Sequence, residues 1–134
     1  MRSFKVCMIE DDQAFLYLAK IIIQSVSEEV EVVTFTDGGK GYDFIEANKS
    51  NAAVLPDLIL LDLNMPYMDG WQFLDAYDKI KDQICRDIPI YVLSSSISET
   101  DINRARANPL VRDFISKPLE EARFAELLKA HETK

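Results

Sequence analysis

Acidic, hydroxyl and basic side chains follow several short apolar runs of this sequence, and their types could support metal or phosphoryl chemistry. Asp62 comes directly after the apolar run Leu58–Leu61. An aspartate at the end of a buried strand can be a nucleophile, a metal ligand or the cap of the next element. Further groups of this kind stand at three other places: the acids Glu10, Asp11 and Asp12, the hydroxyl of Ser94 and the amine of Lys117.

Each of these side chains also has an ordinary structural explanation. The three consecutive acids could stand at the start of a helix, where the helix dipole favours negative charge. Ser94 could be a turn hydroxyl, and Lys117, which precedes Pro118, could be a solvated lysine. Because all four features follow different apolar runs, we interpret them together as one site.

Five apolar runs alternate with five segments of helical pattern. Short, mostly apolar runs predict strands at residues 4–9, 30–35, 58–61, 89–93 and 111–116. The first helix is predicted to start at Asp11 or Asp12 and to carry its apolar side on Phe15, Leu18, Ala19, Ile22, Ile23 and Val26. The remaining helices are predicted near residues 42–45, after Gly70 as far as Ile84, over residues 98–107, and from Leu119 onward.

Three glycines surround Lys40 just before the second predicted helix. We interpret residues 38–41 as a loop or as the frayed start of that helix. A phosphate-binding loop would need a Gly-Lys-Ser/Thr ending and a wider glycine spacing. The segment therefore does not predict nucleotide binding.

Strict alternation of strands and helices predicts an α/β fold. The expected architecture is a five-stranded parallel sheet with five helices covering both of its faces, joined by right-handed crossovers. The carboxyl ends of parallel strands meet at one edge of the sheet, which is where ligands bind in such folds. The side chains singled out above are therefore expected to converge there.

A group of carboxylates at one edge favours a hard divalent cation. Mg²⁺ prefers oxygen ligands and completes its shell with water and phosphate. Asp11 and Asp62 are expected to be direct ligands, with the main-chain carbonyl of Asn64 as a third and Glu10 acting through a water molecule. If a phosphoryl group moves onto Asp62, Lys117 can pair with its oxygens and the hydroxyl of Ser94 can donate to one of them.

Composition limits the class of protein. The chain has 134 residues, of which 48% are apolar, and a formal charge of −8. That charge opposes binding to nucleic acid. The apolar runs are too short to span a membrane. Cys7 lies within the first predicted strand and Cys85 near the end of a predicted helix, and these positions indicate reduced thiols rather than a disulfide. We therefore expect a cytoplasmic protein.

These residues resemble the receiver domain of response regulators, the phospho-accepting part of two-component signalling systems. The resemblance covers nearly the whole chain. It rests on the order and spacing of residues 9–11, residues 58–70, Ser94 and residues 114–118. It implies a flavodoxin-like, doubly wound sheet with strand order 2-1-3-4-5.

The resemblance also assigns roles to individual residues. It implies that Asp62 is the phosphorylation site, that Glu10, Asp11 and Asn64 complete the Mg²⁺ site, and that Lys117 is the active-site lysine. It allows a cis bond between Lys117 and the proline that follows.

Two positions depart from the commonest family pattern. Glu10 stands where aspartate is frequent, and its longer side chain can still hold a metal-bound water, which leaves open whether Asp12 joins the shell. Phe114 stands where many receivers have a tyrosine. By resemblance, Ser94 moves toward the phosphoryl group and the Phe114 ring turns inward. Because Phe114 has no hydroxyl, a partner would have to recognise its shape.

The resemblance further implies partners. The phosphoryl donor would be a histidine kinase or a histidine phosphotransfer protein. The output would be binding of a downstream protein to the fourth helix, fifth strand and fifth helix, roughly residues 100–128. We expect a stand-alone receiver, residues 1–134, which is a signalling module and not a turnover enzyme.

Two alternatives remain. A Mg²⁺-dependent phosphatase or phosphotransferase of the haloacid-dehalogenase type also forms an aspartyl phosphate, but it needs a second aspartate where Asn64 stands. An adaptor that is never phosphorylated usually lacks the acceptor aspartate or the lysine, and both Asp62 and Lys117 are present.

Overall fold

A single parallel sheet of five strands, in the order β2-β1-β3-β4-β5, forms the centre of the molecule and confirms the predicted fold. The computed structural model describes residues 3–132. The strands are β1 (Lys5–Ile9), β2 (Glu31–Phe35), β3 (Leu58–Leu61), β4 (Ile90–Ser94) and β5 (Val111–Ser116). The helices are α1 (Gln13–Val26), α2 (Gly38–Ala47), α3 (Gly70–Ile80), α4 (Glu99–Ala107) and α5 (Glu121–His131), with a 3₁₀ turn η1 (Lys81–Gln83) after α3.

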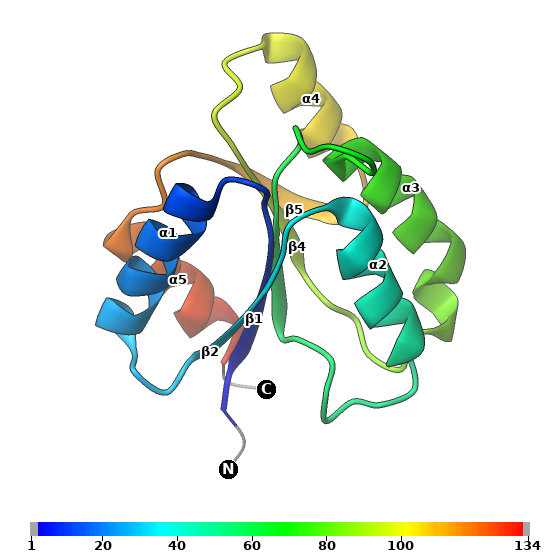
Figure 1. Cartoon of the computed structure of the whole chain (residues 1–134), viewed down its shortest axis with the longest axis horizontal. Coiled ribbons are helices and arrows are strands. Elements are labelled where there is room, and N and C mark those ends of the chain that lie inside the picture. The colour runs from blue at the N-terminus through cyan, green and yellow to red at the C-terminus, as the bar shows by residue number, and fades with distance from the viewer. Residues whose placement is uncertain (1–2, 133–134) are drawn as a thin grey trace.

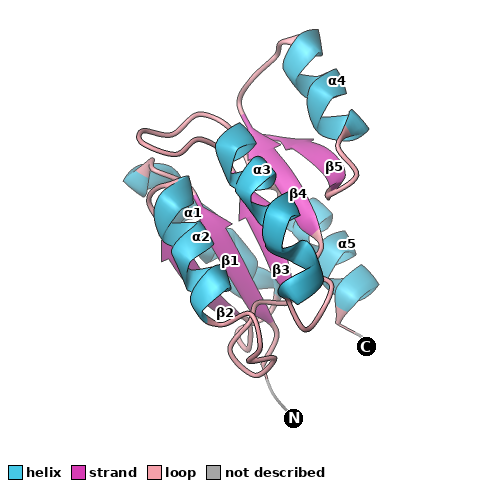
Figure 2. Ribbon diagram, turned by 90° about the vertical axis from the view of Figure 1, so that its right-hand side faces the viewer, coloured by secondary structure: helices cyan, strands magenta, loops and turns pink. Residues whose placement is uncertain are grey.

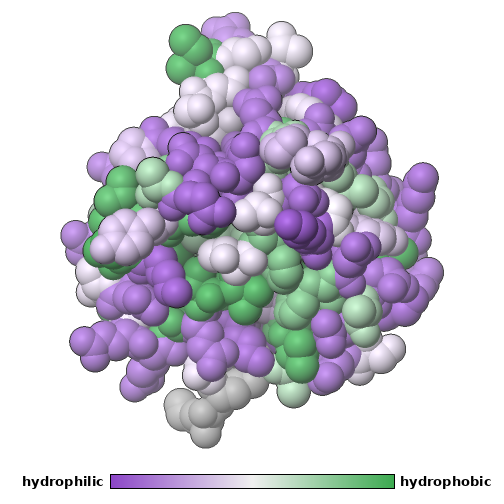
Figure 3. Space-filling view, in the orientation of Figure 1, coloured by the Kyte–Doolittle hydropathy of each residue, from purple (hydrophilic) through white to green (hydrophobic). Residues whose placement is uncertain are grey.

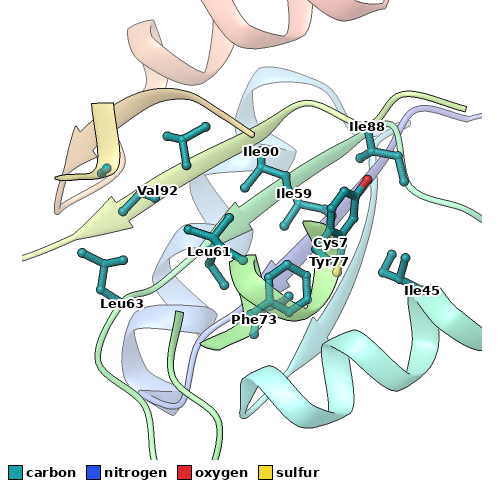
Figure 4. Packing of buried hydrophobic residues seen from close by; sticks show 14 of the residues in the cluster. Cys7, Ile45, Ile59, Leu61, Leu63, Phe73, Tyr77, Ile88, Ile90 and Val92 are labelled. Carbon is teal, nitrogen blue, oxygen red and sulfur yellow. The ribbon is translucent and has the colours of Figure 1, made fainter. Parts of the chain in front are cut away.

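Helices cover both faces of the sheet, as Figure 1 shows with the sheet seen nearly edge-on. α1 and α5 lie on one face, and α2 and α3 pack beside each other on the other. The four residues of β3 are all buried because this central strand has helices on both sides. Its side chains alternate between two apolar clusters: Ile59 and Leu61 join Phe73 and Tyr77 on the α3 side, shown in Figure 4.

Side-chain caps set the starts of four helices. The carboxylates of Asp12, Asp37 and Asp69 accept backbone N–H groups in the first turns of α1, α2 and α3, and the Ser98 hydroxyl does the same for α4. Asp69 and Gln72 form a reciprocal capping box. The predicted start of the first helix is therefore confirmed, with Asp12 as the residue that caps it.

The glycine segment belongs to α2 rather than to a loop. Gly38 is the first residue of the helix, and a Cβ on it would lie 2.6 Å from the carbonyl oxygen of Met68. A Cβ on Gly41 would lie 2.5 Å from Cδ1 of Ile9. These glycines let the start of α2 pack closely against β1 and against the loop that follows β3. The reading as a frayed helix start was the better of the two alternatives.

Three details differ from the sequence prediction. α3 ends at Ile80 and the chain tightens into a 3₁₀ turn, so Ile84 is buried outside the helix. α5 begins at Glu121 instead of Leu119, although Leu119 is buried in the preceding segment. Leu18 was predicted on the buried side of α1 but is 60% exposed, because α1 is apolar on more than one side and buries Leu16 instead.

α4 extends beyond the other helices at the end of the sheet (Figures 1 and 2). Ala105 is its one buried residue, and its packing partner is β5. Hydrophilic residues dominate the face drawn in Figure 3, with groups of apolar residues between them. Within residues 3–132, no helix has both the length and the apolar character needed to cross a membrane.

Candidate functional site

Four strands each deliver one of the predicted side chains to the same edge of the sheet. Backbone hydrogen bonds extend the ladders by one residue past the strands: Glu10 N donates to Phe35 O, Asp62 N to Ile9 O and Lys117 N to Ser94 O, each at 2.9 Å. The acids from β1 and β3, the serine of β4 and the lysine after β5 are therefore held by main chain. The structure brings together the side chains of Glu10, Asp11, Asp62 and Lys117, as predicted, and ties Ser94 to Lys117 through the main chain.

Three carboxylates form a compact cluster at this edge. One oxygen each from Glu10, Asp11 and Asp62 lies within 4.8 Å of the other two. Glu10 and Asp62 are only 2% and 6% exposed, whereas Asp11 faces solvent. Oxygen ligands at this spacing, two buried and one open to water, suit a hard divalent cation such as Mg²⁺.

Asp12 has a different place from its two acidic neighbours. Its side chain accepts the N–H of Phe15 at 3.1 Å and caps α1, while its own N–H donates to Glu10 Oε2 at 3.1 Å. The residue thus fixes the start of α1 and holds Glu10 through the backbone. The metal-type cluster consists of Glu10, Asp11 and Asp62.

The Lys117 side chain enters the cluster from the β5 side. Its Nζ lies 2.5 Å from Glu10 Oε1 and 3.6 Å from Asp62 Oδ1. Pairing with Asp62 was predicted, and the shorter contact to Glu10 was not. The Lys117–Pro118 peptide bond is cis, as the resemblance allowed.

Burial dominates the acid–base properties of the two inner carboxyl groups. It raises the pKa of Glu10 to about 7, against the opposing effects of Lys117 and of the Asp12 N–H. Burial also raises the pKa of Asp62, with Lys117 as the largest opposing influence. One ammonium does not compensate two buried carboxylates, so the site favours an additional cation.

Ser94 is the last residue of β4, and Phe114 lies in the neighbouring strand β5, two residues before the partner of Ser94. Ser94 is fully buried, and its Oγ accepts the N–H of Ser96 at 3.1 Å. The ring of Phe114 is buried in the cluster on the α3 side, so the structure describes the inward ring. Asn64 lies in the exposed loop after β3, two residues beyond Asp62. A motion coupling Ser94 to Phe114 stays a prediction.

Gly70 lets the loop after β3 return close to its own start. Its N–H donates to Leu63 O at 3.0 Å, and a Cβ there would lie 2.4 Å from the carbonyl oxygen of Asp62. Asp62 Oδ1 in turn accepts the N–H of Leu63 at 2.9 Å. Gly70 therefore helps to hold the Asp62 backbone in place. The sequence contained a signal for this close approach only in the pair Asp69-Gly70, which the structure places at the start of α3.

Residues 6–129 match the response regulator receiver domain family. The chain belongs to this family. A curated relative of this receiver is the probable methanogenesis regulatory protein FilR2 of Methanothrix harundinacea, 28% identical over 116 residues that cover 87% of this chain and 73% of FilR2. In three other curated relatives the matched region is only 28% to 32% of the relative's length.

Solved structures share the fold of this receiver. The two component response regulator from Cytophaga hutchinsonii has a TM-score of 0.86 and 25% identity, and the match covers 100% of both chains. The phosphorylated cyanobacterial phytochrome response regulator RcpA has a TM-score of 0.74 and 32% identity, over 96% of this chain and 90% of RcpA. The receiver is therefore a component of two-component signalling, and its geometry is consistent with phosphoryl acceptance.

Two contacts between a cation and an aromatic ring were not predicted from the sequence. The Lys117 ammonium lies 4.3 Å from the centroid of the Phe15 ring, and the Arg104 guanidinium lies 4.0 Å from that of Trp71. Phe15 and Trp71 were assigned to apolar helix stripes, because helical spacing does not reveal which ring also faces a cation. Each contact joins residues far apart in the chain.

Proposed function

We propose that this receiver accepts a phosphoryl group on Asp62 from the phosphohistidine of a histidine kinase or of a histidine phosphotransfer protein. An oxygen of the Asp62 carboxylate attacks phosphorus, the phosphorus–nitrogen bond breaks, and the imidazole nitrogen keeps the electron pair and takes up a proton. The burial of Asp62 at the end of the central strand, 3.6 Å from an ammonium, is the observation that carries this proposal.

The acidic cluster is proposed as a Mg²⁺ site. Glu10, Asp11, Asp62 and the main-chain carbonyl of Asn64 would hold the ion, with Glu10 acting through a water molecule. The all-oxygen set of donors and the raised pKa values of the buried acids support this assignment. When bound, Mg²⁺ neutralises charge on the phosphoryl oxygens.

Lys117 and Ser94 are proposed to bind the transferred group. The Lys117 ammonium reaches both Glu10 and Asp62, so a small turn of its flexible side chain brings it to a phosphoryl oxygen on Asp62. Ser94 can donate its hydroxyl hydrogen to another such oxygen, since its oxygen accepts the N–H of Ser96. Because the Phe114 ring is already buried, the proposed switch is a motion of Ser94 toward the phosphoryl group that changes the packing around this inward ring.

The face formed by α4, β5 and α5 is the proposed output surface. Asp113 of β5 ties both helices to the strand: Oδ1 lies 3.5 Å from Arg106 Nε of α4, and Oδ2 lies 3.0 Å from Arg123 Nη2 of α5. α4 is weakly anchored, with Ala105 as its buried residue. Phosphorylation shifts such a surface only by the difference in phosphoryl stabilisation between its two states. The downstream protein would recognise the shape of this face.

We treat residues 1–134 as one receiver unit whose output is binding. The family match over residues 6–129 supports this division. Turnover of an outside substrate is not part of the proposal, because Asn64 stands where an aspartyl-phosphate phosphatase needs a second aspartate.

The proposal is tested with acetyl phosphate as a small phosphodonor. The protein is incubated with acetyl phosphate and Mg²⁺, or with EDTA in place of Mg²⁺, and its intact mass is measured. We expect one base-labile phosphoryl group, only in the presence of Mg²⁺, and none on Asp62→Asn. Asp69→Asn is the matched control, since asparagine retains the helix cap. Steady release of phosphate without labelled protein would instead indicate an enzyme, and no modification an adaptor.

A further inference from the structure

The ring of Phe15 borders the cation at the centre of the site. Lys117 Nζ lies 4.3 Å from the ring centroid, inside the ~6 Å limit of a cation–π contact. The same ammonium contacts the carboxylates of Glu10 and Asp62 at 2.5 and 3.6 Å. The cation is thus enclosed by two anionic groups and one aromatic ring.

Local structure fixes where the ring stands. Phe15 is the third residue of α1, and its N–H donates to the capping carboxylate of Asp12 at 3.1 Å. The half-buried side chain packs against the apolar cluster shared by α1 and α5. The cap and this packing hold the ring at the edge of the pocket. The ring therefore has a defined position before any ligand arrives.

We propose that Phe15 is a positioning residue that holds the Lys117 ammonium ready for the oxygens of a phosphoryl group on Asp62, an inference that rests on the proposed function. A lysine ammonium on its flexible stem loses rotamer freedom when it is held inside a pocket. An aromatic face attracts the cation through its quadrupole. Because the ring does not accept a conventional hydrogen bond, it holds the ammonium without replacing its contacts to Glu10 and Asp62.

A ring that merely fills space would act through its shape, and one that positions the cation acts through its electron density. Fluorine atoms on phenylalanine withdraw electron density from the ring face with little change in ring shape. Substituting fluorinated phenylalanines at position 15 therefore separates the two roles without removing the side chain from the core.

The experiment measures the rate of phosphorylation by acetyl phosphate with saturating Mg²⁺ across a series of one to four ring fluorines. We expect the rate to fall with each added fluorine, by about fivefold over the series, the equivalent of ~1 kcal/mol. The matched control is the same series at Phe4, a half-buried ring that packs against the same apolar cluster at the other edge of the sheet. In the Phe4 control series, the phosphorylation rate should not change with the number of fluorines.

Two results would overturn this inference and leave the proposed function intact. One is a flat series at Phe15 in a protein that is otherwise phosphorylated, and the other is an equal decline at Phe4. If the unsubstituted protein takes no phosphoryl group, the proposed function fails and the inference fails with it. A readout without phosphorylation is the proton chemical shift of the Lys117 ε-methylene. It should move downfield in Phe15→Leu as the ring current is lost, and an unchanged shift would refute the contact.

Discussion

Lys117 and Glu10 form a close ion pair inside the site, with 2.5 Å between Nζ and Oε1. Asp62 is 1.1 Å farther from the same ammonium, at 3.6 Å. The lysine therefore compensates Glu10 first, and Asp62 is the less fully paired of the two buried carboxyl groups. This unequal pairing suits a nucleophile, because the ammonium holds Asp62 less tightly than it holds Glu10.

Replacing Lys117 by methionine should destabilise the metal-free protein in a pH-dependent way. At pH 8 the free energy of unfolding should fall by about 3 kcal/mol, because Glu10 is left as a buried, unpaired charge. At pH 5 the loss should be much smaller, since Glu10 can take up a proton. Urea unfolding in EDTA at the two pH values measures this difference, with Lys129→Met, on the exposed side of α5, as the control. An equal loss at both pH values would contradict the assigned pairing.

The stability of the metal-free protein should decrease as the pH rises from about 5 to about 8. Folding raises the pKa of Glu10 from 4.5 to about 7, mainly through burial. In that window the folded state keeps a proton that the unfolded state releases, so a higher pH favours unfolding. The raised pKa of Asp62 acts in the same direction.

Unfolding followed by circular dichroism across this pH range provides the measurement. Glu10→Gln should flatten the dependence, because glutamine does not titrate. Glu29→Gln, at an exposed position, should leave it unchanged. A stability that rises with pH in the absence of metal would show that pairing with Lys117 outweighs burial.

Much of the fold and site follows from local sequence patterns. Alternation of apolar strands with amphipathic helices predicts a parallel sheet, and in such a sheet the carboxyl ends of the strands must share an edge. That argument alone brings Glu10, Asp62, Ser94 and Lys117 together. Helix starts at Asp12 and Ser98 were also predictable, because capping depends on residues close in sequence.

The parts that were missed depend on contacts between distant residues. The sequence left residues 38–41 open between a loop and a helix start, because the close contact of Gly38 with the carbonyl of Met68 joins segments distant in sequence. Leu18 is exposed because a helix with apolar residues on several sides can bury only one of them. Lys117 lies nearer to Glu10 than to Asp62 by about one ångström, and a difference of that size depends on side-chain packing that the sequence does not reveal.

Mg²⁺ should bind through Asp11 but not through Asp12. At a Mg²⁺ concentration ten times the Kd, the free energy of unfolding should rise by about 1.4 kcal/mol. Asp11→Asn should weaken this effect strongly, because it removes a carboxylate of the cluster. Asp12→Asn should preserve it, since asparagine can cap α1 equally well. Calorimetric Mg²⁺ titrations of the three proteins test the assignment, and a comparable loss in Asp12→Asn would place Asp12 in the metal shell.

Gly70→Ala should damage both stability and phosphorylation. The added Cβ would lie 2.4 Å from the Asp62 carbonyl oxygen, so the main chain at the acceptor residue has to move. We expect a loss of about 3 kcal/mol, at the upper end for overpacking, and slower labelling by acetyl phosphate. Gly39→Ala is the control, because its Cβ would approach only Asp37 Oδ1 at 3.1 Å and Met68 Cβ at 4.0 Å. Equal stability of the two variants would show that the loop relaxes freely.

Tyr67 occupies a backbone conformation that favours glycine, in the loop between Asp62 and α3. Its φ is 65° and its side chain is 92% exposed, so the ring adds little packing to offset the strain. Tyr67→Gly should therefore raise the free energy of unfolding by about 1 kcal/mol, after allowing for the greater freedom of glycine in the unfolded chain. Tyr67→Ala keeps the strain without the ring and should change stability little. If chemical denaturation shows that alanine stabilises as much as glycine does, removal of the exposed ring and not relief of backbone strain is the cause.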